Sequence, residues 1–267
     1  MSEVHLESVA VAHPMPVVSA PAQRKHAGSD AMGMLLSLTT TIVIAIFVIT
    51  FVVQAFQIPS ESMEKTLLIG DYLLVDKAHY ASDRWFGWLL PYRRIEHQDI
   101  VVFRYPVNPQ QHFVKRVVGV PGDHVRLIDK HVYVNGVRQA DEYATFNWGQ
   151  RDRFRDNFPN GGFYVDRIAS KWFNQAQKLM DDGQLIIPEG YYFVLGDNRD
   201  DSYDSRYWGL VPADNIVGRP LIIYWSMDQA PPSVMEDSAS GKLSTLAYSA
   251  VQSFKGLRWK RMFRVPN

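Results

Sequence analysis

The longest apolar stretch of the chain runs from Met34 to Phe56, where nearly every residue is aliphatic, aromatic, Thr or Ser. No Asp, Glu, Lys or Arg occurs between Asp30 and Glu61. Because about 20 helical residues cross a hydrocarbon core of ~30 Å, this stretch predicts a transmembrane helix over residues 34–56. A cleaved signal peptide usually has a shorter apolar core close behind a basic segment, so we favour a signal anchor that is not cleaved.

The residues before this anchor predict its orientation. Residues 1–33 are rich in Ala, Val, Pro and Ser and have no helical or strand period, which indicates a flexible tail. Arg24 and Lys25 lie in this tail, and basic residues mark the cytoplasmic side of a membrane helix. We therefore expect a cytoplasmic tail, a single membrane pass, and residues 57–267 on the extracytoplasmic side.

Beyond the anchor, short apolar segments alternate with turn residues, which is typical of β-strands. One of these segments ends at Asn135-Gly136, the strongest short signal for a hairpin. Closely spaced strands with one candidate helix favour antiparallel sheets over alternating βαβ units, so we predict a mainly β domain. The predicted strands cover residues 72–75, 100–103, 113–120, 125–128, 132–134, 185–187, 191–195 and 222–225.

Two regions depart from the strand pattern. Residues 138–184 are aromatic, charged and Gly-rich around one candidate helix at 165–180, which indicates an insertion or cap. Residues 229–267 read as a linker followed by apolar positions at helical spacing and a cluster of basic residues. This basic amphipathic segment either packs on the domain with a solvated basic end or touches anionic lipid.

Composition narrows the classes of function. The 28 basic and 28 acidic residues leave no net charge, so no overall field favours nucleic acid. Cysteine is absent, which excludes disulfides, cysteine nucleophiles and thiolate metal sites. The eight histidines lack an H-x-x-x-H spacing, so a metalloprotease is not indicated and we expect no metal or cofactor.

Candidate chemistry begins where the apolar stretch ends. Ser60 and Ser62 follow that stretch, and Lys115 lies within the apolar strand 113–120. A serine hydroxyl is a weak nucleophile until a neighbouring base takes its proton. A lysine can do this near neutral pH when burial lowers its pKa. Because Lys115 and Arg116 point to opposite faces of the strand, one of them leaves the solvent side if the strand is half buried.

Each polar segment also has a plain structural interpretation. Ser60 suits a helix N-cap, and Lys115 suits a solvent-facing strand position. The segments 196–202 and 204–209 read individually as a polar turn and a local ion pair. It is their joint occurrence, in this order behind an anchor, that favours chemistry.

Three segments together resemble the signatures of the bacterial type I signal peptidase (leader peptidase) family, namely Phe56–Met63, Lys115–Asp123 and Gly196–Arg206. The resemblance covers Phe56 to about Gly218, apart from the insertion. It implies a serine–lysine endopeptidase of the bacterial inner membrane that removes signal peptides through an acyl-enzyme, with no cofactor. The implied partners are secretory precursors with small residues at positions −1 and −3 and the lipid bilayer. Nucleic acid is not among them, and a monomer is expected.

The resemblance also implies roles for individual residues. Ser62 would be the nucleophile and Lys115 the general base. Ser60 and the backbone N–H of Ser62 would form an oxyanion hole, and Ser202 would orient the lysine through its hydroxyl. Four further residues would fix the turn that carries Ser202: Asp197, Asn198, Asp204 and Arg206. The last two of these would form an ion pair.

Apolar positions of the same segments would line shallow pockets that exclude bulky side chains by size. These positions are Phe56, Ile58, Pro59, Met63, Leu67, Phe113 and Val114. Three departures from the family pattern concern this cleft. Glu61 replaces a usually small residue, Lys65 replaces a frequent proline, and Phe113 replaces an expected tyrosine.

Other interpretations stay open at this point. Ser62-Met63-Glu64-Lys65 matches S-x-x-K, the nucleophile motif of β-lactamases and penicillin-binding proteins, but neither S-D-N nor K-T-G occurs in the chain. A narrower serine–lysine peptidase, such as a pilus-precursor processing enzyme, would share the dyad. A non-catalytic anchored β-domain that binds partners would tolerate loss of Ser62. A self-cleaving repressor would need a DNA-binding segment, which residues 1–33 do not offer.

Overall fold

The computed structural model describes residues 27–80, 93–147, 149, 151–159, 170–228 and 256–267. Most of the predicted tail and the apolar part of the predicted C-terminal amphipathic segment lie outside these residues. The chain divides into two units, residues 1–45 and 46–267, which are described separately.

The first unit contains one long apolar helix. Helix α1 spans Ala27–Phe47 and continues as a π-helical turn, η1, over Val48–Val52. Residues 31–50 are long and apolar enough to cross a membrane. The hydroxyls of Thr39, Thr40 and Thr41 donate to carbonyls four residues earlier, so these polar groups are satisfied within the helix.

The apolar stretch extends further than the helix. Strand β1 (Val53–Gln57) follows η1 directly, so the last residues of the predicted span of 34–56 are extended. An apolar run alone does not distinguish the end of a membrane helix from the start of a half-buried strand. This strand belongs to the second unit, which begins at residue 46.

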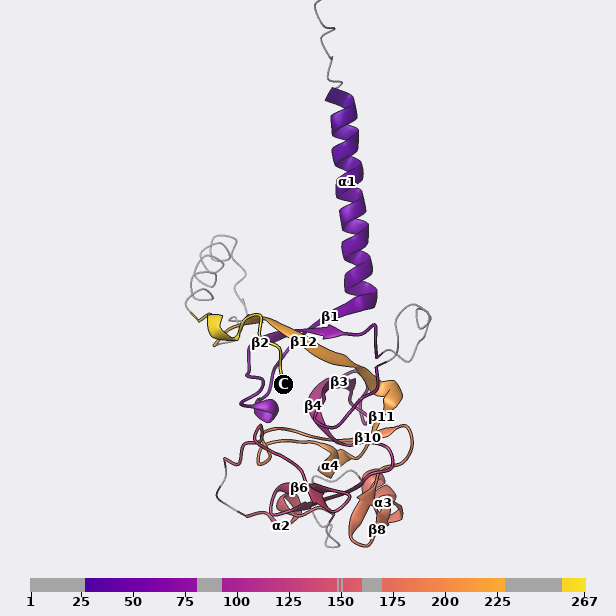
Figure 1. The fold of residues 1–267 in the computed structure, drawn as a ribbon, viewed down its shortest axis with the longest axis vertical. Coiled ribbons are helices and arrows are strands. Elements are labelled where there is room, and N and C mark those ends of the chain that lie inside the picture. Colours follow the sequence, from indigo (N-terminus) through magenta and orange to yellow (C-terminus); the bar gives the residue numbers. More distant parts are fainter. Residues whose placement is uncertain (1–26, 81–92, 148, 150, 160–169, 229–255) are drawn as a thin grey trace, which may run out of the picture. The chain divides into compact units, whose positions relative to one another are not determined.

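The second unit is built from two antiparallel sheets, which confirms the prediction of a mainly β fold (Figure 1). The larger sheet has seven strands in the order β1-β2-β12-β3-β4-β10-β11. Its remaining strands are β2 (Asp71–Asp76), β12 (Ile216–Ser226), β3 (Ile100–Arg104), β4 (His112–Gly119), β10 (Tyr191–Leu195) and β11 (Val211–Pro212).

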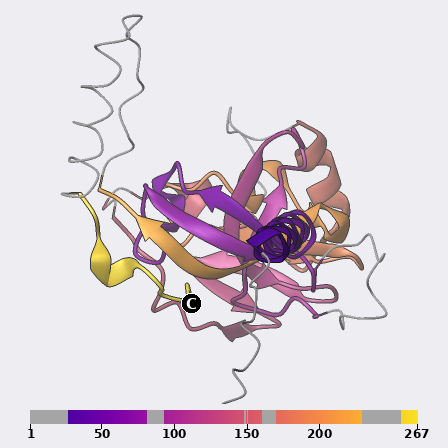
Figure 2. The ribbon, with the colours of Figure 1, turned by 90° about the horizontal axis from the view of Figure 1, so that it is seen from above.

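Strand β12 joins the two halves of this sheet. It pairs with β3 through Ile216 and Gly218, and with β2 from Arg219 to Ser226, with register shifts along its length. Figure 2 shows β12 lying beside β2 when the molecule is seen from above. A Cβ at position 218 would collide with the backbone carbonyl of Asp76, so only glycine permits this close approach of the strands.

The smaller sheet has five strands in the order β7-β6-β5-β9-β8. Asn135 and Gly136 both have positive φ angles, 51° and 79°, and close the predicted hairpin between β6 and β7. The strands are β5 (His124–Ile128), β6 (His131–Val134), β7 (Val137–Arg138), β8 (Met180–Asp181) and β9 (Gln184–Ile186).

The predicted insertion contributes two helices, α2 (Arg153–Asp156) and α3 (Ser170–Lys178). Helix α3 falls within the predicted helix 165–180, whose first residues lie outside the described part of the chain. Buried Phe154, Phe158 and Trp172 belong to the same hydrophobic cluster as the strands of the larger sheet. The region therefore shares the main core of the domain.

The basic residues near the end of the chain have internal partners. Arg261 donates to both oxygens of the buried carboxylate of Asp71, at 3.2 and 2.6 Å, and Arg258 reaches the same carboxylate at 3.5 Å. Arg264 forms a backbone bridge with Ile223 of β12. Part of the predicted basic cluster thus secures residues 256–267 to the larger sheet.

Candidate active site

The turn that carries Ser62 is anchored by apolar residues on either side of it. Ile58 and Met63 are 3% and 1% exposed and belong to a second hydrophobic cluster, with residues of β2, β3 and β12. Residues Glu61–Met63 form a 3-10 turn, η2, which follows Ile58 and contains both Ser62 and Met63. Ser60 occupies the N-cap position of this turn, as one interpretation of the sequence predicted, but its side chain makes no capping bond. Its Oγ lies 3.3 Å from Ser62 Oγ instead.

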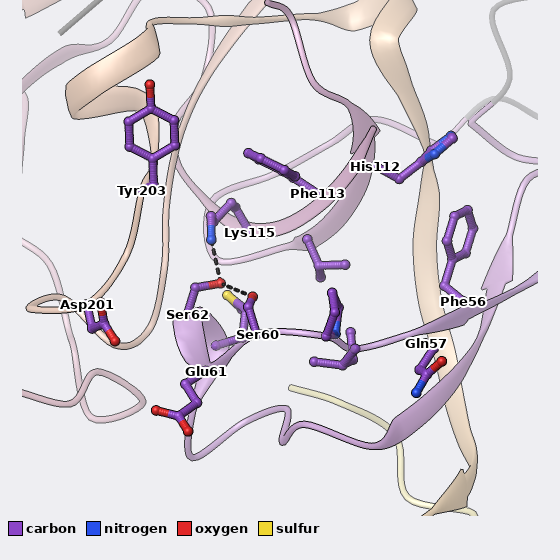
Figure 3. A pocket seen from close by; sticks show the side chains of 14 residues that line it. Phe56, Gln57, Ser60, Glu61, Ser62, His112, Phe113, Lys115, Asp201 and Tyr203 are labelled. Atoms are coloured by element: carbon purple, nitrogen blue, oxygen red, sulfur yellow. Dashed lines mark hydrogen bonds between the residues drawn. The ribbon is translucent and has the colours of Figure 1, made fainter. Parts of the chain in front are cut away.

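Lys115 reaches Ser62 from the middle of β4. Strand β4 pairs with β3 on one side and β10 on the other, which leaves Lys115 and Arg116 only 4% and 2% exposed. Lys115 Nζ donates to Ser62 Oγ at 2.5 Å. Figure 3 shows these two side chains pointing toward one another, with Ser60 beside Ser62.

The surroundings of Lys115 favour its neutral form. Burial lowers the pKa of Lys115 to about 8, while Asp204 acts to raise this pKa and Arg206 to lower it. A neutral amine has the lone pair that a general base needs, and with a pKa of about 8 roughly a tenth of Lys115 is neutral at pH 7 and about half at pH 8.

Arg116, on the opposite face of β4, binds the loop that follows β10. Its Nε and Nη2 each donate to one oxygen of Asp197 at 2.8 Å, and both side chains are almost fully buried. Thr66 Oγ1 donates to Asp197 Oδ2 at 2.6 Å. The bidentate pair joins the lysine strand to the loop after β10. The bond from Thr66 connects the same carboxylate to the segment after the nucleophile turn.

The loop Gly196–Asp204 leads into helix α4 (Ser205–Trp208) and is fixed by a buried ion pair. Asp204 and Arg206 are both 0% exposed and pair at 2.8 Å. Burial would raise the pKa of Asp204, but Arg206 outweighs it and holds that pKa below its ordinary value. Asn198 N donates to the carbonyl of Ser62 at 3.1 Å, so the loop also touches the nucleophile turn.

A pocket of about 490 Å³ opens beside the dyad (Figure 3). Its lining includes six of the seven predicted substrate-binding residues: Phe56, Ile58, Pro59, Met63, Phe113 and Val114. Leu67 is fully buried in the hydrophobic cluster behind the turn and is not among the lining residues. The lining also includes Ser60, Ser62 and Lys115.

Comparison with known proteins assigns the family. Residues 31–225 match the family model described as "Signal peptidase, peptidase S26". The chain belongs to this family. It is 36% identical over 199 residues to a protein named signal peptidase I from Pseudomonas fluorescens, a match that covers 66% of each chain. A protein of the same name from Aquifex aeolicus is 34% identical over 226 residues, with 72% of this chain and 83% of the relative covered.

Among solved structures, the crystal structure of a signal peptidase I from Enterococcus faecalis shares 32% sequence identity. It aligns with 48% of this chain and 97% of its own, with a TM-score of 0.36. The family resemblance predicted from the three sequence segments is confirmed by the family model and by the Pseudomonas and Aquifex relatives. The chain spans about two thirds of the length of the Pseudomonas relative.

In this member of the signal peptidase family, Lys65 points away from the dyad. Its side chain is exposed, and its Nζ donates to the backbone carbonyl of Glu142. Its backbone has a φ of 80°, a left-handed conformation that ends the nucleophile turn. The lysine of the S-x-x-K match therefore has a partner elsewhere, and Lys115 is the lysine that meets Ser62.

Ser202, which was predicted to orient Lys115, lies in the loop after β10. Its Oγ is buried and has no hydrogen-bond partner within the described part of the chain, Lys115 included. It packs against Gly196, on the side where the carbonyl of Ser62 also lies. A Cβ at position 196 would overlap both groups, so glycine is required for the loop to lie against the nucleophile turn.

Five further residues line the pocket: Gln57, Glu61, His112, Asp201 and Tyr203. Of these, the sequence analysis named only Glu61, as a departure from the family pattern. Position offered a signal for some of them. His112 is two residues before Val114 on β4, so alternation places both on one face of the strand. Asp201 and Tyr203 flank Ser202, and no periodic pattern in that loop indicates which of its side chains reach the pocket.

Proposed function

We propose that this chain is a membrane-anchored endopeptidase that removes signal peptides from exported precursors, with Ser62 as nucleophile and Lys115 as base. The observation that carries the proposal is the 2.5 Å contact between Lys115 Nζ and Ser62 Oγ in a largely apolar pocket. Membership of the signal peptidase family supports the choice of substrate.

In the proposed reaction, neutral Lys115 takes the proton of Ser62 while Ser62 Oγ attacks the carbonyl carbon of the −1 residue, the last residue of the signal peptide. The negative charge that develops on the carbonyl oxygen is stabilised by Ser60 Oγ–H and the backbone N–H of Ser62. The resulting lysine ammonium protonates the departing amine, which leaves the signal peptide esterified to Ser62. Lys115 then activates water, which hydrolyses this ester and frees the hydroxyl.

Ser202 completes the proposed site. Its hydroxyl has no hydrogen-bond partner among the described residues and lies beside the nucleophile turn, and we propose that it reaches Lys115 directly or through a water during the reaction. Asp197, Asn198, Asp204 and Arg206 would hold the loop that carries it. We propose that these four side chains are structural and take no part in proton transfer.

Helix α1 would hold this site at the bilayer surface. The chain has a helix that is long and apolar enough to cross a membrane, and its named relatives are bacterial signal peptidases. We propose that the tail before α1 is cytoplasmic and that the β-rich unit is extracytoplasmic, because Arg24 and Lys25 precede the helix. Anchoring confines enzyme and membrane-bound precursor to one surface, which raises their effective concentration.

The substrate proposal is tested with detergent-solubilised full chain and two matched precursors. One precursor carries Ala at positions −3 and −1, and the other differs only by Leu at −1. We expect cleavage directly after the −1 Ala and a rate at least about 100-fold lower for Leu, because a shallow pocket excludes the larger side chain. Mass spectrometry of the products gives the cleavage site. Equal rates, or cleavage elsewhere, would refute the proposed specificity.

The pH dependence tests the proposed base. Lys115 acts only when deprotonated, and its pKa is about 8. Below that value, kcat/KM is therefore expected to rise about tenfold per pH unit, and above it to reach a plateau. Initial rates on the Ala precursor between pH 5.5 and 9.5 measure the profile. A profile that is flat from pH 6 to 9 would rule out Lys115 as the base.

A further inference from the structure

Residues 142–147, at the start of the predicted insertion, run alongside the loop that follows β10; we call them the strap. Thr145 of the strap forms a parallel bridge with Asn198. Thr145 N donates to the carbonyl of Asp197 at 2.8 Å, and Arg199 N donates to the carbonyl of Thr145 at 3.0 Å. The loop also bonds to Ser62 through the backbone N–H of Asn198, so it lies between the strap and the nucleophile turn.

The ring of Tyr143 covers two buried arginines. The guanidinium carbon of Arg116 lies 4.0 Å from the ring centroid, and that of Arg199 lies 5.8 Å from it. Arg199 is 1% exposed, and its Nε and Nη2 have no hydrogen-bond partner in the described part of the chain. An aromatic face attracts such poorly solvated cations. Through Arg116, Tyr143 also supports the strand position next to Lys115.

The strap touches the nucleophile turn as well. Asn147 Nδ2 donates to Glu64 Oε2 at 3.1 Å, and the same oxygen accepts from Asn198 Nδ2 at 3.3 Å. Lys65 Nζ donates to the carbonyl of Glu142. Glu64 and Lys65 come directly after η2, so both ends of the strap bind the segment that leaves Ser62.

We propose that the strap sets the position of Ser62 relative to Lys115, with Tyr143 and Asn147 as positioning residues. The nucleophile turn, the lysine strand and the loop after β10 come from separate parts of the chain, and the strap contacts all three. Neither residue lines the pocket. The inference rests on the proposed Ser62–Lys115 chemistry, where a misplacement of 1 Å can cost a factor of ~100 in rate.

Tyr143→Leu tests the proposal because it removes the aromatic ring but keeps an apolar side chain of moderate size. We expect kcat for the Ala precursor to fall about tenfold with KM within about twofold, because the reacting groups are displaced while the pocket is unchanged. Tyr143→Phe keeps the ring and is expected to retain at least about half of the wild-type kcat. Tyr133→Leu is the matched control, because Tyr133 also covers an arginine, Arg126, at 5.7 Å, but in the smaller sheet.

A second measurement tests the role of the strap independently of the proposed substrate. The burst of p-nitrophenol from p-nitrophenyl acetate reports acylation of Ser62 whatever the natural substrate is, and Ser62→Ala gives the background. The Tyr143→Leu variant is expected to slow this burst about tenfold as well. An enzyme that shows the burst but leaves precursors intact would refute the substrate proposal alone.

Asn147→Ala covers the case in which Tyr143→Leu does not fold, because Asn147 is exposed and the change removes its side-chain hydrogen bond to Glu64. We expect it to lower kcat and the burst rate about threefold. Folded Tyr143→Leu and Asn147→Ala with wild-type kcat and burst rate would overturn the proposal. So would an equal loss in Tyr133→Leu, since it would show a general effect on stability.

Discussion

Replacing Ser62 or Lys115 by Ala is expected to lower the rate of precursor cleavage by about 10⁴-fold or more, since the two act as one unit. Lys115 Nζ lies 2.5 Å from Ser62 Oγ, so the loss of either side chain removes the proton transfer that activates the nucleophile. The double variant is therefore expected to be no slower than either single variant. Cleavage of the Ala precursor by detergent-solubilised enzyme measures all three rates.

Lys65→Ala is the matched lysine control for this prediction. It follows Ser62 by three residues, but its ammonium binds the carbonyl of Glu142. We expect it to retain cleavage within about tenfold of the wild type, because it loses one positioning contact and no reacting group. If Lys65→Ala were inactive and Lys115→Ala active, the base would be Lys65 and the proposed role of Lys115 would be wrong. If Ser62→Ala cleaved normally, the chain would use another nucleophile.

Arg206→Met is expected to reduce the free energy of unfolding by about 3–5 kcal/mol, because it leaves the carboxylate of Asp204 charged and unpaired. Both side chains are 0% exposed, and Arg206 also donates to the carbonyls of Arg155 and Arg199. The loop that carries Ser202 would loosen together with this pair. The midpoint of urea unfolding, followed by tryptophan fluorescence, measures the change.

Arg219→Met is the control for this second prediction, since Arg219 pairs with Asp99 where both side chains are more exposed. We expect it to cost about 1 kcal/mol or less, as is usual for partly solvated pairs. Adding Asp204→Leu to Arg206→Met is expected to recover part of the loss, because the buried charge is removed. An equal loss of unfolding free energy in Arg206→Met and Arg219→Met would show that burial of an ion pair does not determine its contribution to stability.

Local patterns in the sequence predicted much of this fold. Each predicted strand overlaps a strand of the structure, because short apolar segments bounded by turn residues leave few other conformations. Alternation on β4 indicated that Lys115 and Arg116 could not both be solvent-exposed. The structure goes further and buries both, since β4 lies between β3 and β10. Pairing with distant strands is not encoded in the strand itself.

The candidate site was predictable only as far as its residues lie in contiguous segments. The six predicted substrate-binding positions that line the pocket come from two short runs of the chain, 56–63 and 113–114. Leu67 continues the spacing of the first run, but the chain turns at Lys65 and directs it into the core. Contacts of the strap join separate parts of the sequence, such as Asn147 and Glu64, which are 83 positions apart, and no periodicity in the sequence indicates them.

The pairing of Asp71 with Arg261 joins residues 190 positions apart and so sets an order of events during synthesis. Asp71 is synthesised early, whereas Arg261, whose guanidinium binds its carboxylate, is synthesised only after strand β12. Until then the carboxylate must stay hydrated, because an unpaired charge is expensive to bury. Since Arg261 also donates to the carbonyl of Thr66, just beyond the nucleophile turn, that turn is completed late. A nascent chain would thus reach the membrane before its hydrolytic site is assembled.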